Sequence, residues 1–309
     1  MLRGRLILDC SVLLPGPFVG KLLAERGARV VKVENPIQPD GAKTIGSLYK
    51  DLNELKEIRL LNLLDSKDTK SFHELVRNAD GLIEAFRPSA KKKLGLDSQT
   101  LHSVNPRLSI LSLVGYPEDG PDRDRAGHDL NFAAVTGCAS LFREMPALPL
   151  ADLFSAYNGA FALTAAMDSV SRGAAPGARV VVSLSETLRQ AQSPLIRDFR
   201  DRGAAPRPGE TLFSGRYPCY RLYTAGDGRR VAFGAIEPKF WQRACAVLRV
   251  PHAAPHGMAD GAPGAEAAAA VQRALGARPW AEWAPLFAAA DCCVEPVREY
   301  HEIYPRAQP

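Results

Sequence analysis

The sequence has no apolar run of the roughly 20 residues that a membrane-spanning helix needs, so we expect no membrane partner. The apolar residues 6–8 are followed at once by Asp9, which predicts a strand here rather than a secretory signal. The six cysteines have no paired spacing typical of metal ligands. We therefore expect that the protein binds no metal. We also expect that its cysteines are free thiols in a reducing, cytoplasmic setting.

Signatures of nucleotide cofactors and of nucleic-acid binding are missing as well. No G-x-G-x-x-G run follows the first predicted strand, so the sequence does not support nicotinamide or flavin binding. The formal net charge of +5 is spread over 39 basic and 34 acidic residues without a basic stripe. This diffuse excess suits an anionic substrate and does not indicate nucleic-acid binding.

Short β-rich runs alternate with helical stretches in the first part of the chain. The predicted strands cover residues 5–9, 29–34, 59–63, 81–86, 107–114 and 179–184, and the helical segments include 18–26, 70–79 and 152–171. This alternation is typical of an α/β fold in which helices cover both faces of a parallel sheet. We predict a doubly wound, Rossmann-like large domain over residues 1–195.

The composition changes in the last third of the chain. Residues 202–208 are rich in Gly, Pro and Arg, as a connector is. Beyond them, two β-rich runs flank Gly226-Asp227-Gly228, which predicts a hairpin, and Pro238 predicts the start of a helix. With 309 residues the chain is long enough for two domains. We predict a smaller α+β domain over 205–290 and a short C-terminal return segment over 291–309.

Three segments supply residue types for acid–base chemistry. They place His128 in GHDLNF, Asp152 in LADLF and Glu237 in GAIEPKF. An imidazole and two carboxylates can move a proton on and off carbon beside a thioester, because the carbonyl delocalises the carbanion as an enolate. Each residue also has an ordinary alternative: a helix cap for Asp152, a loop histidine for His128, and a cap before Pro238 for Glu237.

Further motifs extend this pattern in a fixed order along the chain. They are LPGP at 14–17, LAERGA at 23–28, VKVE at 31–34, FRP at 86–88, LGL at 94–96 and DCCVEPV at 291–297. With the three segments above, they resemble the family III CoA transferases of CaiB/BaiF type, and within that family the 2-methylacyl-CoA racemases. The resemblance covers most of the chain and is weakest over residues 42–70.

The resemblance implies a fold and a mechanism. Family members are interlocked homodimers whose active site lies between the large domain of one subunit and the small domain of the other. In a racemase, His128 and Asp152 would exchange a proton with the α-carbon of a 2-methylacyl-CoA from opposite faces, while Glu237 orients His128. No cofactor is implied beyond the CoA or phosphopantetheine moiety of the substrate.

Two other functions remain open. In CoA transfer, Asp152 attacks the acyl thioester as a nucleophile, and this chemistry has no use for His128. The other is a degenerate, non-catalytic homodimer that binds acyl thioesters, because the chain stops soon after His301 whereas family members continue. The presence of His128, Asp152 and Glu237 together favours an enzyme over a binding protein.

The resemblance also assigns positions that contact CoA or its acyl thioester. They are Arg87, Lys93, Leu63, Tyr116, Phe132 and Lys56. Of these, Arg87 and Lys93 match positions that bind the CoA phosphates, so they are the expected anchors for the nucleotide half of the substrate.

One stretch departs from the family pattern. Glu54, Glu57 and Leu64 stand where family members carry basic side chains that hold the nucleotide half of CoA. We therefore expect weak nucleotide binding, or a substrate carried on the phosphopantetheine arm of an acyl carrier protein. The alternative is that another lysine reaches the same phosphates from a re-routed loop; the candidates are Lys43, Lys50 and Lys56.

Overall fold

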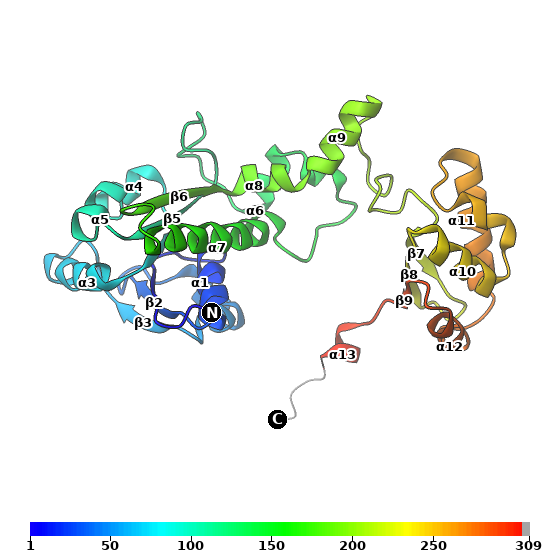
Figure 1. The fold of residues 1–309 in the computed structure, drawn as a ribbon, viewed down its shortest axis with the longest axis horizontal. Helices are drawn as coiled ribbons and strands as arrows, with labels where there is room; N and C mark the ends of the chain where they lie inside the picture. The colour runs from blue at the N-terminus through cyan, green and yellow to red at the C-terminus, as the bar shows by residue number, and fades with distance from the viewer. Residues whose placement is uncertain (305–309) are drawn as a thin grey trace. The chain divides into compact units, whose positions relative to one another are not determined.

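The computed structural model describes residues 1–304, which form two compact units divided in sequence between Asp198 and Phe199 (Figure 1). The first unit contains a six-stranded sheet and the second a three-stranded sheet. Within residues 1–304, no helix is long and apolar enough to cross a membrane.

The sheet of the first unit is parallel throughout. Its strands are β1 (Leu6–Asp9), β2 (Arg29–Glu34), β3 (Glu57–Leu60), β4 (Gly81–Glu84), β5 (Ser109–Val114) and β6 (Ala178–Ser183). Their order is β3-β2-β1-β4-β5-β6, and every neighbouring pair is parallel, so the predicted α/β class is confirmed. The prediction for β3 was displaced towards residue 63. As an edge strand, β3 leaves most of its side chains exposed, so its apolar pattern does not mark which residues pair.

Side chains that alternate along the strands fill two separate cores, one on each face of the sheet. Ile7 packs in one core and its neighbour Leu8 in the other. The core around Ile7 is covered by α1 (Pro15–Glu25), α7 (Leu150–Ser171) and α8 (Leu184–Ala191). The core around Leu8 is covered by α3 (Ser66–Asn78) and α5 (Ser98–Val104). Helices on both faces explain why the central strands are apolar on both sides.

Shorter helices lie in the connections of the first unit. They are η1 (Gly41–Thr44), α2 (Gly46–Asn53), α4 (Pro88–Lys93), α6 (Asp129–Val135) and η2 (Cys138–Leu141). A further helix, α9 (Ser193–Arg202), crosses the division between the two units.

The second unit combines an antiparallel sheet with helices. Its elements are β7 (Tyr220–Thr224), β8 (Arg230–Gly234), α10 (Pro238–Leu248), η3 (Pro251–His256), α11 (Gly261–Leu275), α12 (Trp280–Ala290), β9 (Val294–Pro296) and α13 (Tyr300–Ile303). The predicted hairpin is confirmed, because β7 and β8 pair antiparallel around the Gly-Asp-Gly turn. β9 pairs with β8, so the sheet extends into residues that the sequence analysis assigned to a C-terminal return segment.

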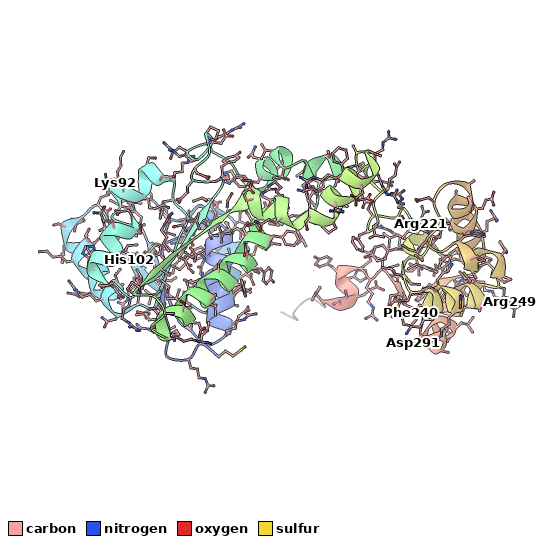
Figure 2. The ribbon with its side chains drawn as sticks, turned by 45° about the horizontal axis from the view of Figure 1, so that its top comes forward. Lys92, His102, Arg221, Phe240, Arg249 and Asp291 are labelled. Carbon is pink, nitrogen blue, oxygen red and sulfur yellow. The ribbon has the colours of Figure 1, made fainter. Side chains whose placement is uncertain are left out.

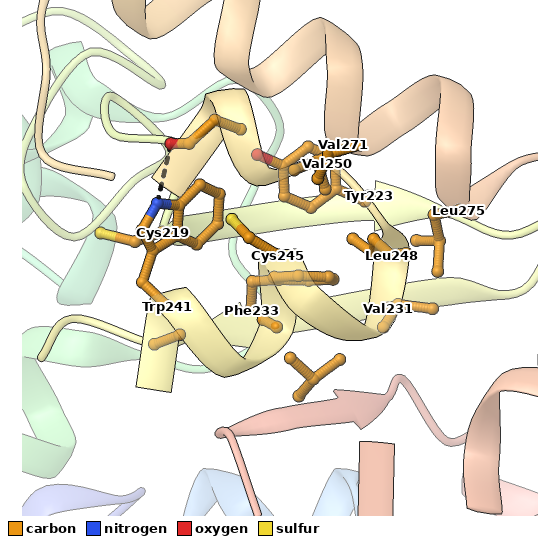
Figure 3. Packing of buried hydrophobic residues seen from close by; sticks show 14 of the residues in the cluster. Cys219, Tyr223, Val231, Phe233, Trp241, Cys245, Leu248, Val250, Val271 and Leu275 are labelled. Carbon is orange, nitrogen blue, oxygen red and sulfur yellow. Dashed lines mark hydrogen bonds between the residues drawn. The ribbon is translucent and has the colours of Figure 1, made fainter. Parts of the chain in front are cut away.

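The core of the second unit combines aliphatic side chains with aromatic ones, of which Figure 3 labels Tyr223, Phe233 and Trp241. Trp241 is buried and its Nε1–H donates to the carbonyl of Ala253 at 3.1 Å. Tyr223 packs edge to face on Phe233, with ring centroids 4.8 Å apart, and its hydroxyl donates to the carbonyl of Pro218. Each polar end is thus paired while the ring is buried, which fixes these side chains in single orientations.

Two ion pairs are fully buried beneath the loop that joins β1 to α1. Lys56 Nζ lies 2.8 Å from Asp9 Oδ2, and Lys32 Nζ lies 3.1 Å from Asp40 Oδ2, with all four side chains inaccessible to solvent. Burial alone would raise the pKa of Asp9, but Lys56 and Lys32 outweigh this effect and hold that pKa at about 2. Gly20 leaves room for the Lys56–Asp9 pair, because a Cβ at this position would lie 2.9 Å from both the Asp9 carboxylate and the Lys56 ammonium.

Removing one partner of the Lys56–Asp9 pair should strongly destabilise the first unit. We expect Lys56→Met to lower the free energy of unfolding by roughly 3–5 kcal/mol, because the buried Asp9 carboxylate then loses the ammonium in direct contact with it. Denaturant unfolding measures this change. A matched control is Lys92→Met on the exposed surface of α4, which should change stability by less than about 0.5 kcal/mol (Figure 2). Equal effects of the two variants would contradict the assignment.

Candidate active site

A cavity of about 180 Å³ opens at the carboxyl edge of the parallel sheet. The segments that follow β1, β4, β5 and β6 line it, with Leu13, Phe86, Gly115 and Leu184 as examples. The strand order reverses between β1 and β4, and open α/β sheets form ligand-binding crevices at such a switch point. His128 and Asp152 both line this cavity, so the structure brings two of the three predicted catalytic residues together.

His128 is positioned by the start of α6. It occupies the N-cap of this helix, and its backbone N–H donates to Oδ1 of Asn131 at 3.0 Å. Behind it, the ring of Phe132 is buried edge to face against Tyr116, with centroids 5.3 Å apart. Gly127 lies close to that ring, since a Cβ there would lie 2.9 Å from it. The GHDLNF segment is therefore a compact helix start that leaves the imidazole exposed at the cavity.

Asp152 lies in the first turn of α7, two residues after the helix begins. The N-cap of α7 is Pro149, which offers no side-chain acceptor, so Asp152 is not the cap that was the alternative explanation for it. Instead, Oδ1 of Asp129 accepts a hydrogen bond from the Asp152 backbone N–H at 3.1 Å. One carboxylate thus joins the start of α7 to the start of α6 and fixes Asp152 relative to His128.

The environment of Asp152 changes its acidity. Burial, and then the negative charge of Asp129, raise the pKa of Asp152 to about 7. At neutral pH the carboxyl group is therefore divided between its protonated and ionised forms. A group in this state can both donate and accept a proton, as general acid–base catalysis requires.

Asp129 was not among the residues that the sequence analysis selected. The only available signal was its place beside His128 in GHDLNF, and this did not reveal the hydrogen bond to a helix 23 positions further along the chain.

The other predicted residues fall into different places. Arg87 lines the cavity that holds His128 and Asp152, and Tyr116 packs against Phe132, which lines the same cavity. Leu63 lines a second cavity beside it. Lys93 is exposed on α4 and lines neither cavity.

The assignment of Lys56 to CoA binding needs correction. Its side chain is fully buried and its ammonium donates to Asp9, to the carbonyl of Pro17 and to the side chain of Asn53. An ammonium with three internal acceptors and no solvent access is committed to the fold and does not reach a ligand.

Glu237 lies in the second unit. It is the N-cap residue of α10 but makes no capping hydrogen bond with its side chain, which is exposed. The alternative explanation of Glu237 as a side-chain cap therefore does not hold.

No metal-ligand cluster was identified in the part of the chain that the structure describes: no group of three or more His, Cys, Asp or Glu side chains is placed to hold an ion.

The fold and the cavity define a parallel α/β protein with a histidine and an aspartate on one cavity at the switch point of its sheet. A sequence model of CoA-transferase family III matches residues 2–308, so the chain belongs to that family. The alpha-methylacyl-CoA racemase of Homo sapiens is 31% identical to this chain, and the match covers 98% of this chain and 79% of the length of the racemase. The acetyl-CoA:oxalate CoA-transferase of Acetobacter aceti is 38% identical, and the match covers 43% of this chain and 36% of the length of the transferase.

Solved structures support the same fold. A hypothetical protein from Mycobacterium tuberculosis superposes with a TM-score of 0.84 at 25% identity, over 99% of this chain and 86% of that one. The resemblance predicted from the motifs is thus confirmed at the level of the family. Because racemases and CoA transferases both occur among the relatives, family membership alone does not decide the reaction.

The raised pKa of Asp152 predicts a pH-dependent effect on stability. An unfolded aspartate ionises near pH 3.8, whereas folded Asp152 ionises at about 7, so its contribution to stability declines as the pH rises through this interval. We expect Asp152→Asn to raise the free energy of unfolding by about 4 kcal/mol at pH 8 and to have almost no effect near pH 4. Urea unfolding of both proteins at the two pH values measures the difference.

Asp129→Asn is the matched control, because it keeps an acceptor for the Asp152 N–H and removes the charge. In that background the benefit of Asp152→Asn at pH 8 should shrink. A benefit that is the same at pH 4 and pH 8 would contradict the raised pKa.

Proposed function

We propose that this protein is a racemase or epimerase of 2-methylacyl-CoA or a related acyl thioester, acting by 1,1-proton transfer. In one direction, His128 removes the proton from the α-carbon, and the electron pair of the broken C–H bond passes into the thioester as an enolate. Asp152 then delivers its own proton to the opposite face, which leaves the inverted centre. The reverse reaction exchanges the two roles, and no other reactant is consumed.

The observation that carries this proposal is the placement of His128 and Asp152 on one cavity, with a pKa of Asp152 near 7. A proton must leave one group and arrive from the other, so both groups need to change protonation state near the working pH. The first turn of α7 adds the positive end of a helix dipole beside Asp152, which favours the negative charge of the enolate.

CoA transfer is the second candidate, because relatives of this chain include CoA transferases. In that reaction the ionised carboxylate of Asp152 attacks the acyl carbon and releases the CoA thiolate, forming an acyl anhydride on the protein. Two features favour the racemase. The raised pKa reduces the ionised fraction of Asp152, and the transferase mechanism leaves His128 without a role.

We also propose a homodimer in which Glu237 of one subunit orients His128 of the other. Two observations support an additional contact surface. The side chain of Glu237 is exposed and free of a capping bond. On α7, a stripe of large side chains at helical spacing is exposed, with Phe154, Tyr157 and Phe161 at 46%, 55% and 74%.

Replacing either catalytic residue should abolish most racemisation. We expect His128→Ala and Asp152→Asn each to slow the loss of optical purity of a chiral 2-methylacyl-CoA by ~10²–10⁴-fold. In deuterated water, the wild-type protein should place deuterium at C2 at a rate matching racemisation. His73→Ala, on α3 and away from the cavity, serves as the control with wild-type activity.

The same assays separate the two reactions. Mass spectrometry of the wild-type protein incubated with an acyl-CoA should detect no covalent acyl adduct. An adduct that disappears in Asp152→Asn, together with full activity of His128→Ala in acyl transfer, would establish the transferase instead.

A shared active site predicts complementation between two inactive variants. His128→Ala and Glu237→Ala subunits that re-associate at random form mixed dimers in half of the cases, and each mixed dimer has one intact site. Refolding an equal mixture should therefore restore about a quarter of the wild-type activity. An active monomer in sedimentation experiments would refute the dimer, as would a mixture no more active than its components.

A further inference from the structure

A second cavity, of about 400 Å³, lies next to the catalytic one. The two share part of their lining, namely Val12, Leu13 and Phe86. The second cavity opens beside the segments that follow β2 and β3, so a ligand that extends from the catalytic cavity past the shared residues enters it. Most of its lining is apolar, and this part includes Val33, Leu61, Leu63, Leu64 and Leu94.

The charges on this cavity are already balanced inside the protein. Among the described residues, its charged lining groups are Glu34 and Asp40, and no lysine or arginine lines it. Asp40 pairs with Lys32, and Glu34 accepts from Lys43 and from the hydroxyl of Tyr49. The remaining titratable group is the Cys10 thiol, whose pKa is raised by burial and by Asp9, so it stays neutral.

Arg87 and Lys93 are adjacent in sequence to the lining residues Phe86 and Leu94, but Arg87 lines the neighbouring cavity and Lys93 is exposed on α4 and lines neither cavity. Two basic residues near β3 are committed elsewhere. Lys56 is enclosed with Asp9, and Arg59 pairs with Glu57 at 2.5 Å. The alternative in which Lys43 or Lys56 replaces the missing phosphate ligands is therefore unfavourable, because each would have to leave a carboxylate partner. Lys50 is exposed on α2 and does not line the cavity.

Cations are found instead around the catalytic cavity. Arg87, Arg123 and Arg125 line it, and the last two lie 3.8 Å and 3.6 Å from neighbouring aspartates of their own loop. Among the residues that line the two cavities, the basic side chains thus belong to the cavity that holds His128 and Asp152.

We propose that this protein recognises the acyl thioester and the uncharged pantetheine arm of its substrate, and that the nucleotide of CoA adds little to binding. This inference rests on the proposed function. Nucleotide phosphates entering the second cavity would lose water without gaining a cation, and they would face two carboxylates, so they cannot contribute net affinity there. The shared ligand chemistry is a pantetheine thioester, whether it comes from CoA or from the arm of an acyl carrier protein.

Calorimetry with CoA and with pantetheine tests the proposal on the wild-type protein. We expect the two dissociation constants to lie within about threefold of each other, and the ratio to change little with salt because no exposed ion pair is involved. CoA that binds more than tenfold tighter than pantetheine would overturn the proposal.

A gain-of-function pair sharpens the test. Leu64 lines the second cavity and is 69% exposed, so it can accept a larger polar side chain. Leu64→Arg should tighten CoA about tenfold through one charge-assisted contact and leave pantetheine unchanged, whereas Leu64→Gln should change neither. Equal CoA binding by the two variants would show that the nucleotide does not enter this cavity, which would overturn the placement on which the proposal rests.

Turnover distinguishes the two sources and separates this inference from the proposed function. Racemisation rates of the same acyl group on CoA, pantetheine and an acyl carrier protein identify the preferred carrier, and rates on pantetheine close to those on CoA support the proposal. If the thioesters bind as expected but none is racemised, the proposed reaction fails and the recognition of pantetheine stands. If neither CoA nor pantetheine binds, both fail.

Discussion

The buried pairs of Lys56 with Asp9 and Lys32 with Asp40 support the loop that forms the wall between the two cavities. Lys32 also donates to the carbonyl of Ser11, and Asp40 accepts from the Leu13 N–H at 2.9 Å. Leu13 has a φ of 65°, a left-handed conformation that is unfavourable for a residue with a Cβ. The loop keeps it because opening would leave buried charges without partners, which is far more unfavourable than the local strain.

Asp129 performs a comparable task for the reacting groups. Since Pro149 leaves α7 without a side-chain cap, the start of that helix depends on a carboxylate from another element. The carboxylate of Asp129 fills this role by accepting a hydrogen bond from the Asp152 N–H. The negative charge of Asp129 also raises the pKa of Asp152, which keeps Asp152 partly protonated. Helix capping, the spacing of His128 from Asp152 and the acidity of Asp152 are therefore linked through one side chain.

The distribution of charge follows from these commitments. Lysines that hold the β1–α1 loop and the segment after β2 are not available to a ligand, so the larger cavity has a mostly apolar lining without a lysine or arginine. The cavity that holds His128 retains arginines and Asp152, whose pKa is raised to about 7. Stability requirements in one half of the sheet thus restrict where the protein can recognise a ligand by positive charge.

The sequence alone indicated most of the elements and the residue types that could carry acid–base chemistry. Short β-rich runs alternating with helical stretches predicted the parallel sheet, and Asp152 was placed at the start of a helix, because these patterns depend on near neighbours in the chain. Only the tertiary structure decided the state of the charged groups. Lys56 looked like a substrate ligand until its pairing with Asp9, 47 positions away, was visible, and Asp129 became relevant only through its bond to α7. The burial and the partners of a charge are set by segments distant in sequence, and these contacts fix both the pKa of a group and its availability to a ligand.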